Sequence, residues 1–259
     1  MDKSPYRGEM HGGSYETENL LNQYLLFHYG EAEEQLPWES GPRSGLGFPE
    51  RCVGQGLDPG RLSGKGRALE VGCAVGRATF ELARSFKEVI GVDFSASFVA
   101  AARTLSERGF LDYSIVETGT ITRPAVARRP EGALGSVSFE QGDAQELRQD
   151  IGSFDCVLAA NLLCRLGWPE RFLERLPDLV NPGGQLILTT PNTWLESFTA
   201  KKFWLGATPE SGEPLEAIRG HLEQAFDLDE VWDMPFLIRE HRRKYQWSVA
   251  QASRWIRKN

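Results

Sequence analysis

The sequence predicts an α/β protein whose mostly parallel sheet is covered by helices on both faces. Two observations carry this prediction. Apolar strand-like segments alternate with helical patterns from residue 67 onward, which is typical of a parallel sheet. One such unit lies between Arg67 and Asp93: a strand, a glycine-containing loop, a helix, a second strand and an acid. Two further strands, near residues 228–240 and 245–256, are expected to form an antiparallel edge.

The unit between Arg67 and Asp93 carries the clearest functional signal. A strand is expected at residues 68–71, a tight loop at 72–76, a helix at 77–86 and a second strand at 89–92. Glycine lets the backbone approach a ligand, and the free N–H groups of a helix start attract anionic groups. An acid after the second strand accepts hydrogen bonds from the hydroxyls of a ribose. The unit therefore predicts a site for a nucleoside ligand.

Composition excludes several classes of function. The chain has 259 residues, 41% apolar and 25% charged, with a net charge of -7, so broad attraction to nucleic acid or to an acidic membrane is not expected. No apolar run approaches the ~20 residues of a membrane span, and the first residues lack a signal-peptide core, so a cytoplasmic protein is expected. The four cysteines show no CxxC spacing, which favours reduced thiols and no metal site.

The predicted organisation is one structural unit with an N-terminal lid. Residues 1–13 are expected to be flexible, residues 14–66 to form a helical lid and an irregular connection, and residues 67–259 to form the main domain. The lid helix is predicted at Glu18–Tyr29 with Thr17 as its N-cap, and a short helix is expected within residues 49–54.

The remaining elements follow from periodicity and turn signals. A helix capped by Ser95 or Ser97 should end before Gly109. The other predicted elements are a hairpin of residues 113–117 and 120–125, strands at 137–140, 154–160 and 185–190, helices at 169–179 and 215–226, and turns at 181–184 and 241–244.

Five motifs in order resemble the class I S-adenosylmethionine-dependent methyltransferases. They are EVGCAVG (70–76), VDFS (92–95), QGDA (141–144), FDCVLAANLL (154–163) and NPGG (181–184). The resemblance implies a Rossmann-like fold with a seven-stranded sheet and S-adenosylmethionine as cofactor, with S-adenosylhomocysteine as product. Ala74 stands where many members have a glycine. The implied cofactor contacts are Glu70, Gly72, Cys73, Ala74, Gly76, Arg77, Asp93, Phe94, Ser95, Gly142, Asp143, Ala144 and Asn161.

Segments outside these motifs resemble a narrower family, the 4-mercaptohistidine N1-methyltransferases of ovothiol biosynthesis. They lie at residues 15–30, 48–53, 182–199, 234–240 and 244–255. The resemblance implies methyl transfer to a ring nitrogen of 5-thiohistidine, and a separate iron enzyme that supplies this small-molecule substrate. The acceptor needs an amino-acid clamp and flat walls for its ring. Candidate substrate contacts, chosen by position and residue type, are Tyr15, His28, Asn161, Arg165, Trp194, Arg239 and Tyr245.

No catalytic base is assigned, because the thiol and ring can lose a proton before attack. Several candidates also have structural interpretations: His28 as a helix-face residue, Trp194 as core, and Arg239 as a solvated ion pair with Glu240. Three alternative functions remain. They are methylation of another small molecule, non-catalytic cofactor binding, and nicotinamide-dependent oxidation, for which residues 72–77 lack the GxGxxG pattern.

Overall fold

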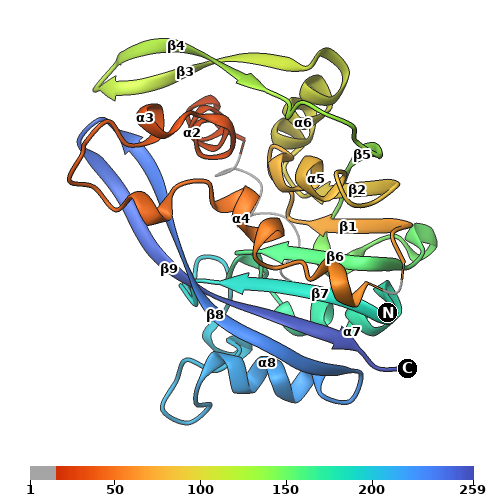
Figure 1. Cartoon of the computed structure of the whole chain (residues 1–259). Coiled ribbons are helices and arrows are strands. Elements are labelled where there is room, and N and C mark those ends of the chain that lie inside the picture. Colours follow the sequence, from red (N-terminus) through yellow and green to blue (C-terminus); the bar gives the residue numbers. More distant parts are fainter. Residues whose placement is uncertain (1–15, 63) are drawn as a thin grey trace.

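The computed structural model describes residues 16–62 and 64–259 and contains a seven-stranded sheet (Figure 1). The strand order is β5-β2-β1-β6-β7-β9-β8, in which the first five strands are parallel and β9 pairs antiparallel with both β7 and β8. The antiparallel strand therefore lies one position inside the edge, and β8 is outermost. The sheet strands are β1 (Arg67–Val71), β2 (Glu88–Asp93), β5 (Ser136–Gln141), β6 (Phe154–Ala160), β7 (Val180–Thr190), β8 (Phe226–His241) and β9 (Lys244–Arg257).

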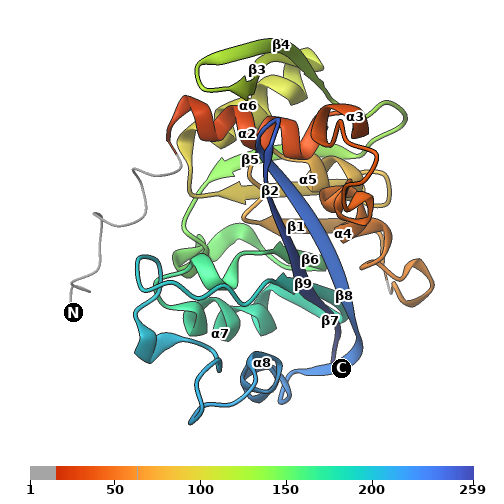
Figure 2. The same cartoon turned by 90° about the vertical axis from the view of Figure 1, so that its left-hand side faces the viewer.

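Helices cover both faces of the sheet. The quarter-turned view separates α4 from α7 and α8 across the strands (Figure 2). A separate hairpin of β3 (Phe110–Thr118) and β4 (Ile121–Arg128) lies over α2 and α6. The helices are α2 (Glu18–Tyr29), α3 (Ala32–Gln35), α4 (Phe48–Gly54), α5 (Arg77–Leu82), α6 (Ala96–Arg108), α7 (Pro169–Leu179) and α8 (Pro214–Leu222).

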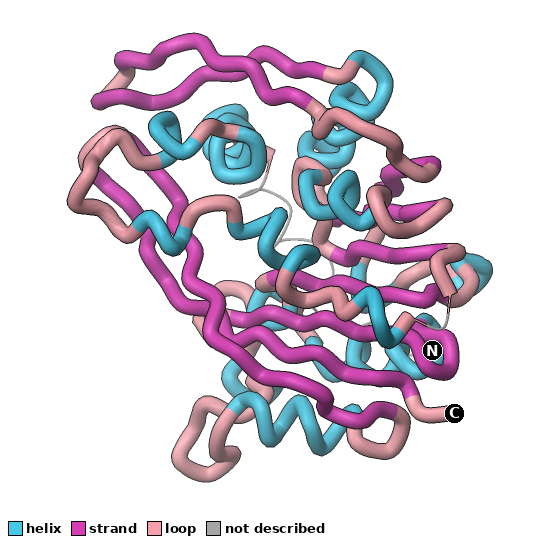
Figure 3. The backbone as a smooth tube through the Cα atoms, in the orientation of Figure 1, coloured by secondary structure: helices cyan, strands magenta, loops and turns pink. Residues whose placement is uncertain are grey.

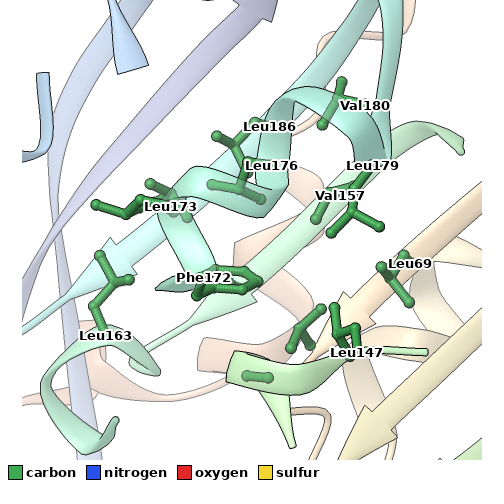
Figure 4. Close-up of a cluster of buried hydrophobic side chains, with 14 of the residues drawn as sticks. Leu69, Leu147, Val157, Leu163, Phe172, Leu173, Leu176, Leu179, Val180 and Leu186 are labelled. Carbon is green, nitrogen blue, oxygen red and sulfur yellow. The ribbon is translucent and has the colours of Figure 1, made fainter. Parts of the chain in front are cut away.

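Side-chain alternation along the central strands divides the core between the two faces. Leu69 and Val157 point to the face covered by α7, where they join Phe172 and Leu176 (Figure 4). Their neighbours Ala68, Cys156 and Leu158 point to the opposite face, under α4 and α5. Because both faces are buried, these strands are apolar at nearly every position, as expected for a parallel sheet.

Local signals for the helix ends are confirmed. The Thr17 hydroxyl accepts a hydrogen bond from the Leu20 N–H at the start of α2. Ser95, rather than Ser97, is the N-cap of α6, and Gly109 ends that helix at a φ of 80°, a left-handed conformation that glycine adopts readily.

Three predicted boundaries are wrong, each for a local reason. Helix α5 ends at Leu82 instead of residue 86, because residues 84 and 85 make tighter i→i−3 hydrogen bonds. Helix α8 ends at Leu222, since Phe226 already pairs with Arg257 in the sheet. The predicted turn at 181–184 lies within β7 as an irregularity opposite residues 154–156, with Gly183 at a φ of 73°.

The β8–β9 hairpin continues beyond the parallel strands and reaches the lid. Figure 3 shows its tip rising toward α2, α3 and the β3–β4 hairpin. The Gln23 side chain of α2 donates to the Arg239 carbonyl of β8 at 3.2 Å. The lid and the sheet edge thus meet, although about two hundred residues separate them in sequence.

Two further findings concern the whole of the described chain. All four cysteines are buried free thiols. No helix within residues 16–62 and 64–259 has the length and apolar character required to cross a membrane.

Candidate active site

A cavity of about 290 Å³ opens at the carboxyl ends of β1, β2 and β6. In folds of this type, ligands bind beyond the carboxyl ends of the parallel strands. The lid helix α2, the start of α4 and the β8–β9 hairpin complete the walls. Most of the residues predicted to bind the cofactor line this cavity. All of them lie within residues 16–62 and 64–259, which the structure describes.

Asp93 ends β2 and is held rigidly at the cavity. Its Oδ2 accepts a hydrogen bond from the Ala74 N–H at 2.8 Å, and its Oδ1 accepts one from the Ser95 N–H at 2.9 Å. These two bonds fix the carboxylate between the loops after β1 and β2. Burial nevertheless raises the pKa of Asp93 above its ordinary value. A fixed acid at this position can accept hydrogen bonds from ribose hydroxyls.

In the loop after β1, the backbone closely approaches the end of β2, as the glycines of the loop allow. Gly72 has a φ of 78°, and the N–H groups of Gly72 and Cys73 both donate to the Val92 carbonyl. Ala74 adopts a φ of 46°, so the substitution for glycine is accommodated in a left-handed conformation. The Tyr29 hydroxyl of α2 donates to the Val75 carbonyl at 2.7 Å, which ties the lid to this loop.

Glu70 is a buried acid at the end of β1. It is 2% exposed and accepts a hydrogen bond from the Thr79 hydroxyl of α5. Burial, assisted by nearby Asp93, raises the pKa of Glu70 to about 8. The carboxyl group therefore carries a proton at neutral pH in the ligand-free protein. A cationic ligand group beside it would favour the ionised form.

At the carboxyl ends of β2 and β5, the cavity is lined by Phe94 and by the segment after β5. Phe94 is 49% exposed, so its ring can cover a flat ligand. Asp143 lines the cavity, but its Oδ1 also accepts the Gln145 N–H at 2.8 Å, which caps a short turn. Gln145 lines the same wall, although the sequence did not single it out. Gly142, Ala144 and Ser95 line this end too.

Asn161 and Arg165 follow β6 and both line the cavity. Asn161 has a φ of 54°, and its Oδ1 accepts a hydrogen bond from the Thr189 hydroxyl at 2.9 Å. Within the described residues, every side-chain hydrogen bond of Arg165 uses Nη1, which donates to groups of Cys164 and to the Thr193 carbonyl. Its Nε and Nη2 are therefore available to a ligand carboxylate.

His28 lines the cavity from α2 as a buried, neutral imidazole. Its side chain is 7% exposed, and Nδ1 has no hydrogen-bond partner among the described residues. Burial, helped by the charge of Arg77, lowers the pKa of His28 to about 3. An imidazole with this pKa is too weak a base to remove a proton efficiently at neutral pH. His28 thus fits a contact role better than a catalytic one.

Three residues predicted to bind the cofactor do not line the cavity. Cys73 is fully buried in the core. Gly76 has a φ of 87°, and a Cβ at this position would lie 2.7 Å from the Phe139 ring, so packing requires the glycine. Arg77 forms ion pairs with Glu50 and Glu81, at 3.0 and 3.1 Å, instead of pointing to a ligand.

Three residues predicted to bind the substrate also lie elsewhere, which corrects those predictions. Trp194 is buried against Trp204, with ring centroids 6.3 Å apart. Arg239 is 4% exposed and pairs with Glu117 at 2.9 Å, so it is neither a cavity residue nor a solvated partner of Glu240. The Tyr245 hydroxyl donates to the Arg242 carbonyl in the hairpin turn. The predicted contact at Tyr15 falls outside the described residues.

Aromatic residues that the sequence did not single out form one wall of the cavity. We call Phe27, Phe48 and Phe236 the phenyl wall; they come from α2, α4 and β8. The Phe27 and Phe48 rings are stacked at 6.0 Å, and Phe48 lies 5.1 Å from Phe236. Gln246 and Ser248 of β9 line the cavity beside them. Strand alternation in residues 234–240 and 244–250 is the signal that could have identified this face.

Known proteins match the region that contains the cofactor motifs. Residues 69–186 match the family profile of a methyltransferase domain. A ubiquinone biosynthesis O-methyltransferase from Azorhizobium caulinodans is 28% identical over 132 residues, which cover 51% of this chain and 43% of that protein. The chain thus matches less than half the length of this relative.

Solved structures share the fold at low sequence identity. A methyltransferase from Methanosarcina mazei aligns with a TM-score of 0.53 and 18% identity, covering 78% of this chain and 98% of that one. The N-methyltransferase NodS from Bradyrhizobium japonicum, in complex with S-adenosylhomocysteine, aligns with a TM-score of 0.51 and 15% identity, covering 92% and 99%.

The comparisons agree on the fold and on the kind of domain that contains the motifs. The chain has the class I methyltransferase fold, with a mostly parallel seven-stranded sheet and helices on both faces. The profile matched by residues 69–186 is that of a methyltransferase domain. The cavity suits S-adenosylmethionine, because the Asp93 carboxylate, Gly72 and Ala74 line one space. The described residues contain no cluster of side chains suited to a metal ion.

Proposed function

We propose that the protein transfers the methyl group of S-adenosylmethionine to a ring nitrogen of 5-thiohistidine, forming ovothiol. One observation carries the proposal. The segments that resemble the 4-mercaptohistidine N1-methyltransferases are scattered through the sequence, yet each described one contributes to the same cavity. Residues 16–30 supply Phe27 and His28, residues 48–53 supply Phe48, residues 234–240 supply Phe236, and residues 244–255 supply Gln246.

The cofactor supplies a sulfonium methyl group, which is already a strong donor. The main task of the protein is then to hold the acceptor nitrogen in line with that methyl, and positioning of this kind contributes roughly 7–11 kcal/mol to lowering the barrier. The substrate also carries a competing nucleophile, its own sulfur. A pocket with fixed walls favours the nitrogen by keeping the sulfur away from the methyl.

Arg165 is the proposed clamp for the substrate carboxylate. It lines the cavity, and its Nε and Nη2 make no hydrogen bond to any described residue. Its guanidinium lies 4.8 Å from the centre of the Phe198 ring, which limits its orientations. A guanidinium with two parallel N–H groups available matches a carboxylate in a forked pair. Arg239, the other arginine considered, is already paired with Glu117.

A second candidate acceptor is a different small aromatic molecule. The apolar phenyl wall would accept other flat rings, and the curated relatives are named as O-methyltransferases of ubiquinone biosynthesis. The outer segments favour 5-thiohistidine, because they resemble the narrower family and line the acceptor side of the cavity.

Incubation of the purified protein with S-adenosylmethionine and 5-thiohistidine tests the proposal. Mass spectrometry should detect one added methyl, and NMR should locate it on a ring nitrogen. A parallel incubation with catechol as acceptor serves as the comparison. Exclusive methylation of sulfur would remove the argument for a positioning pocket. Cofactor binding without any methylation of 5-thiohistidine would refute the proposed substrate.

A further inference from the structure

We infer that the phenyl wall, formed by Phe27, Phe48 and Phe236, holds the acceptor ring and directs methylation to its nitrogen. This inference rests on the proposed function and names the residues that set its selectivity. The three side chains come from α2, α4 and β8, and all three line the cavity. They are 3–7% exposed, so most of each ring is packed in the core and is held in place, and only a small part reaches the cavity.

The geometry of the wall suits a flat ligand. Phe27 and Phe48 stack at 6.0 Å with an interplanar angle of 21°, and Phe236 meets Phe48 at 5.1 Å and Phe27 at 6.4 Å. The His28 ring packs edge-on against Phe27 at 5.3 Å. Aromatic rings packed against one another have few alternative rotamers, so the wall is rigid before the ligand arrives. A planar five-membered ring gains area on such a surface without reorganising it.

Beside the phenyl wall, the β8–β9 hairpin supplies few polar groups to the ring. Cross-strand pairing puts Phe236 opposite Ser248, and Ile238 opposite Gln246. These four residues share one face of the β8–β9 hairpin, and all four line the cavity. The amide and hydroxyl are the polar groups that the hairpin offers, next to an otherwise apolar surface. The acceptor ring therefore has one preferred side for its apolar face and another for its polar edge.

The phenyl wall also suits the positive charge that the acceptor ring gains in the reaction. In the anionic form of 5-thiohistidine, the ring has a thiolate, one N–H and one nitrogen lone pair. That lone pair forms the new N–C bond while the C–S bond of the donor breaks, and its electron pair stays on the donor sulfur. The ring becomes an imidazolium with a thiolate substituent, and no proton moves in this step. Aromatic rings attract a cation, so the wall stabilises the ring more strongly as its positive charge develops.

Leucine at Phe48 or Phe236 tests the inference, because it keeps an apolar side chain and removes the aromatic ring. Each variant should raise the KM for 5-thiohistidine about 10-fold and should increase the share of S-methylated product. Calorimetry should show weaker binding of 5-thiohistidine to the protein loaded with S-adenosylhomocysteine. The affinity for S-adenosylhomocysteine itself should stay within about 2-fold of the wild type.

Phe172→Leu is the matched control, since Phe172 lies on the fully buried face of α7 and does not line the cavity. It should lower stability but keep the wild-type KM and product ratio. Phe236→Tyr, which retains an aromatic ring, should preserve nitrogen selectivity.

Two other outcomes would contradict the inference, and they can be told apart. Wild-type KM and product ratio in both leucine variants would overturn the role of the wall while leaving the proposed function intact. A wild-type protein that binds S-adenosylhomocysteine but neither binds nor methylates 5-thiohistidine would overturn the proposed function, and this inference with it.

Discussion

The two ends of the cavity are built from the chain in different ways. We call the part around Asp93 and the loop after β1 the cofactor end, and the part formed by the phenyl wall and Arg165 the acceptor end. At the cofactor end, Asp93, Ala74 and Ser95 come from two consecutive loops and are joined by backbone hydrogen bonds of 2.8 and 2.9 Å. At the acceptor end, Phe48 and Phe236 lie in contact although they are 188 positions apart in the sequence. The cofactor end follows from the order of strands and loops, whereas the acceptor end exists only after the hairpin β8–β9 has packed against α2 and α4.

This difference indicates which amino-acid substitutions should alter each end. The contacts of Asp93 depend on backbone N–H groups, which every residue type except proline provides, so the cofactor end constrains few side chains around it. The acceptor end consists of side chains on separate elements, and a single substitution there changes its shape. Cofactor binding and acceptor choice should therefore respond to different substitutions, and two experiments can test that separation.

The largest expected effect is at Asp93. Replacing it with alanine removes a buried carboxylate acceptor for ribose hydroxyls, and each hydrogen bond to a charged group contributes about 1.5–3 kcal/mol. The affinity for S-adenosylhomocysteine, measured by calorimetry, should fall at least ~100-fold. Asp178→Ala, at an exposed ion pair with Arg175, is the control and should bind normally. An Asp93→Ala variant with unchanged affinity would show that the cofactor lies elsewhere.

A smaller effect, confined to the acceptor, is expected at Arg165. Glutamine in its place cannot form a forked pair with a carboxylate, so the KM for 5-thiohistidine should rise about 10- to 100-fold. The affinity for S-adenosylhomocysteine should not change. Arg84→Gln removes the same group from a residue paired with Glu81 on the outside of the fold, and serves as the control. Equal losses of cofactor and acceptor affinity in Arg165→Gln would contradict the separation of the two ends.

An effect on stability, with no expected change in which ligand binds, concerns the pH dependence at Glu70. Its pKa of about 8 in the folded protein exceeds the ordinary value of 4.5, so the folded state binds the extra proton between these values. The free energy of unfolding should then fall as pH rises from 4.5 through 8, by an amount on the order of a few kcal/mol.

Glu70→Gln should remove that part of the pH dependence. Denaturant titrations of the ligand-free proteins at pH 6 and pH 9 should show the variant losing less stability than the wild type. Glu131→Gln, at an exposed loop residue, should follow the wild type. Identical pH dependence in the wild type and Glu70→Gln would mean that the carboxyl group is ionised in the folded protein at neutral pH.

The sequence predicted the fold and most of the residues that line the cofactor end of the cavity, because both depend on local patterns. Strand β6 and helix α7 have the predicted bounds, since apolar runs and a proline at the helix start mark them directly. Asp93 and Asn161 follow their strands, and the end of a parallel strand is recognisable in sequence. Arg77 looked like a ligand contact because it begins the helix after the glycine loop, but Glu50 from α4 pairs with it instead.

The acceptor end was predicted less well because it depends on strand register and long-range packing. Arg239 and Tyr245 were chosen for their chemistry, and they do pair across the β8–β9 hairpin. The adjacent pair, Ile238 and Gln246, lines the cavity instead. Successive residues of a strand point to opposite faces, so an error of one position exchanges a ligand contact for a structural residue.

A crystal structure with S-adenosylhomocysteine and 5-thiohistidine would test the central claim, that one cavity joins these two ends, most directly. The account predicts the ribose hydroxyls on Asp93, the acceptor ring against Phe48 and Phe236, and the substrate carboxylate on Arg165. One ring nitrogen should face the sulfur of S-adenosylhomocysteine. An acceptor bound away from the phenyl wall, or with its sulfur facing that atom, would contradict the account.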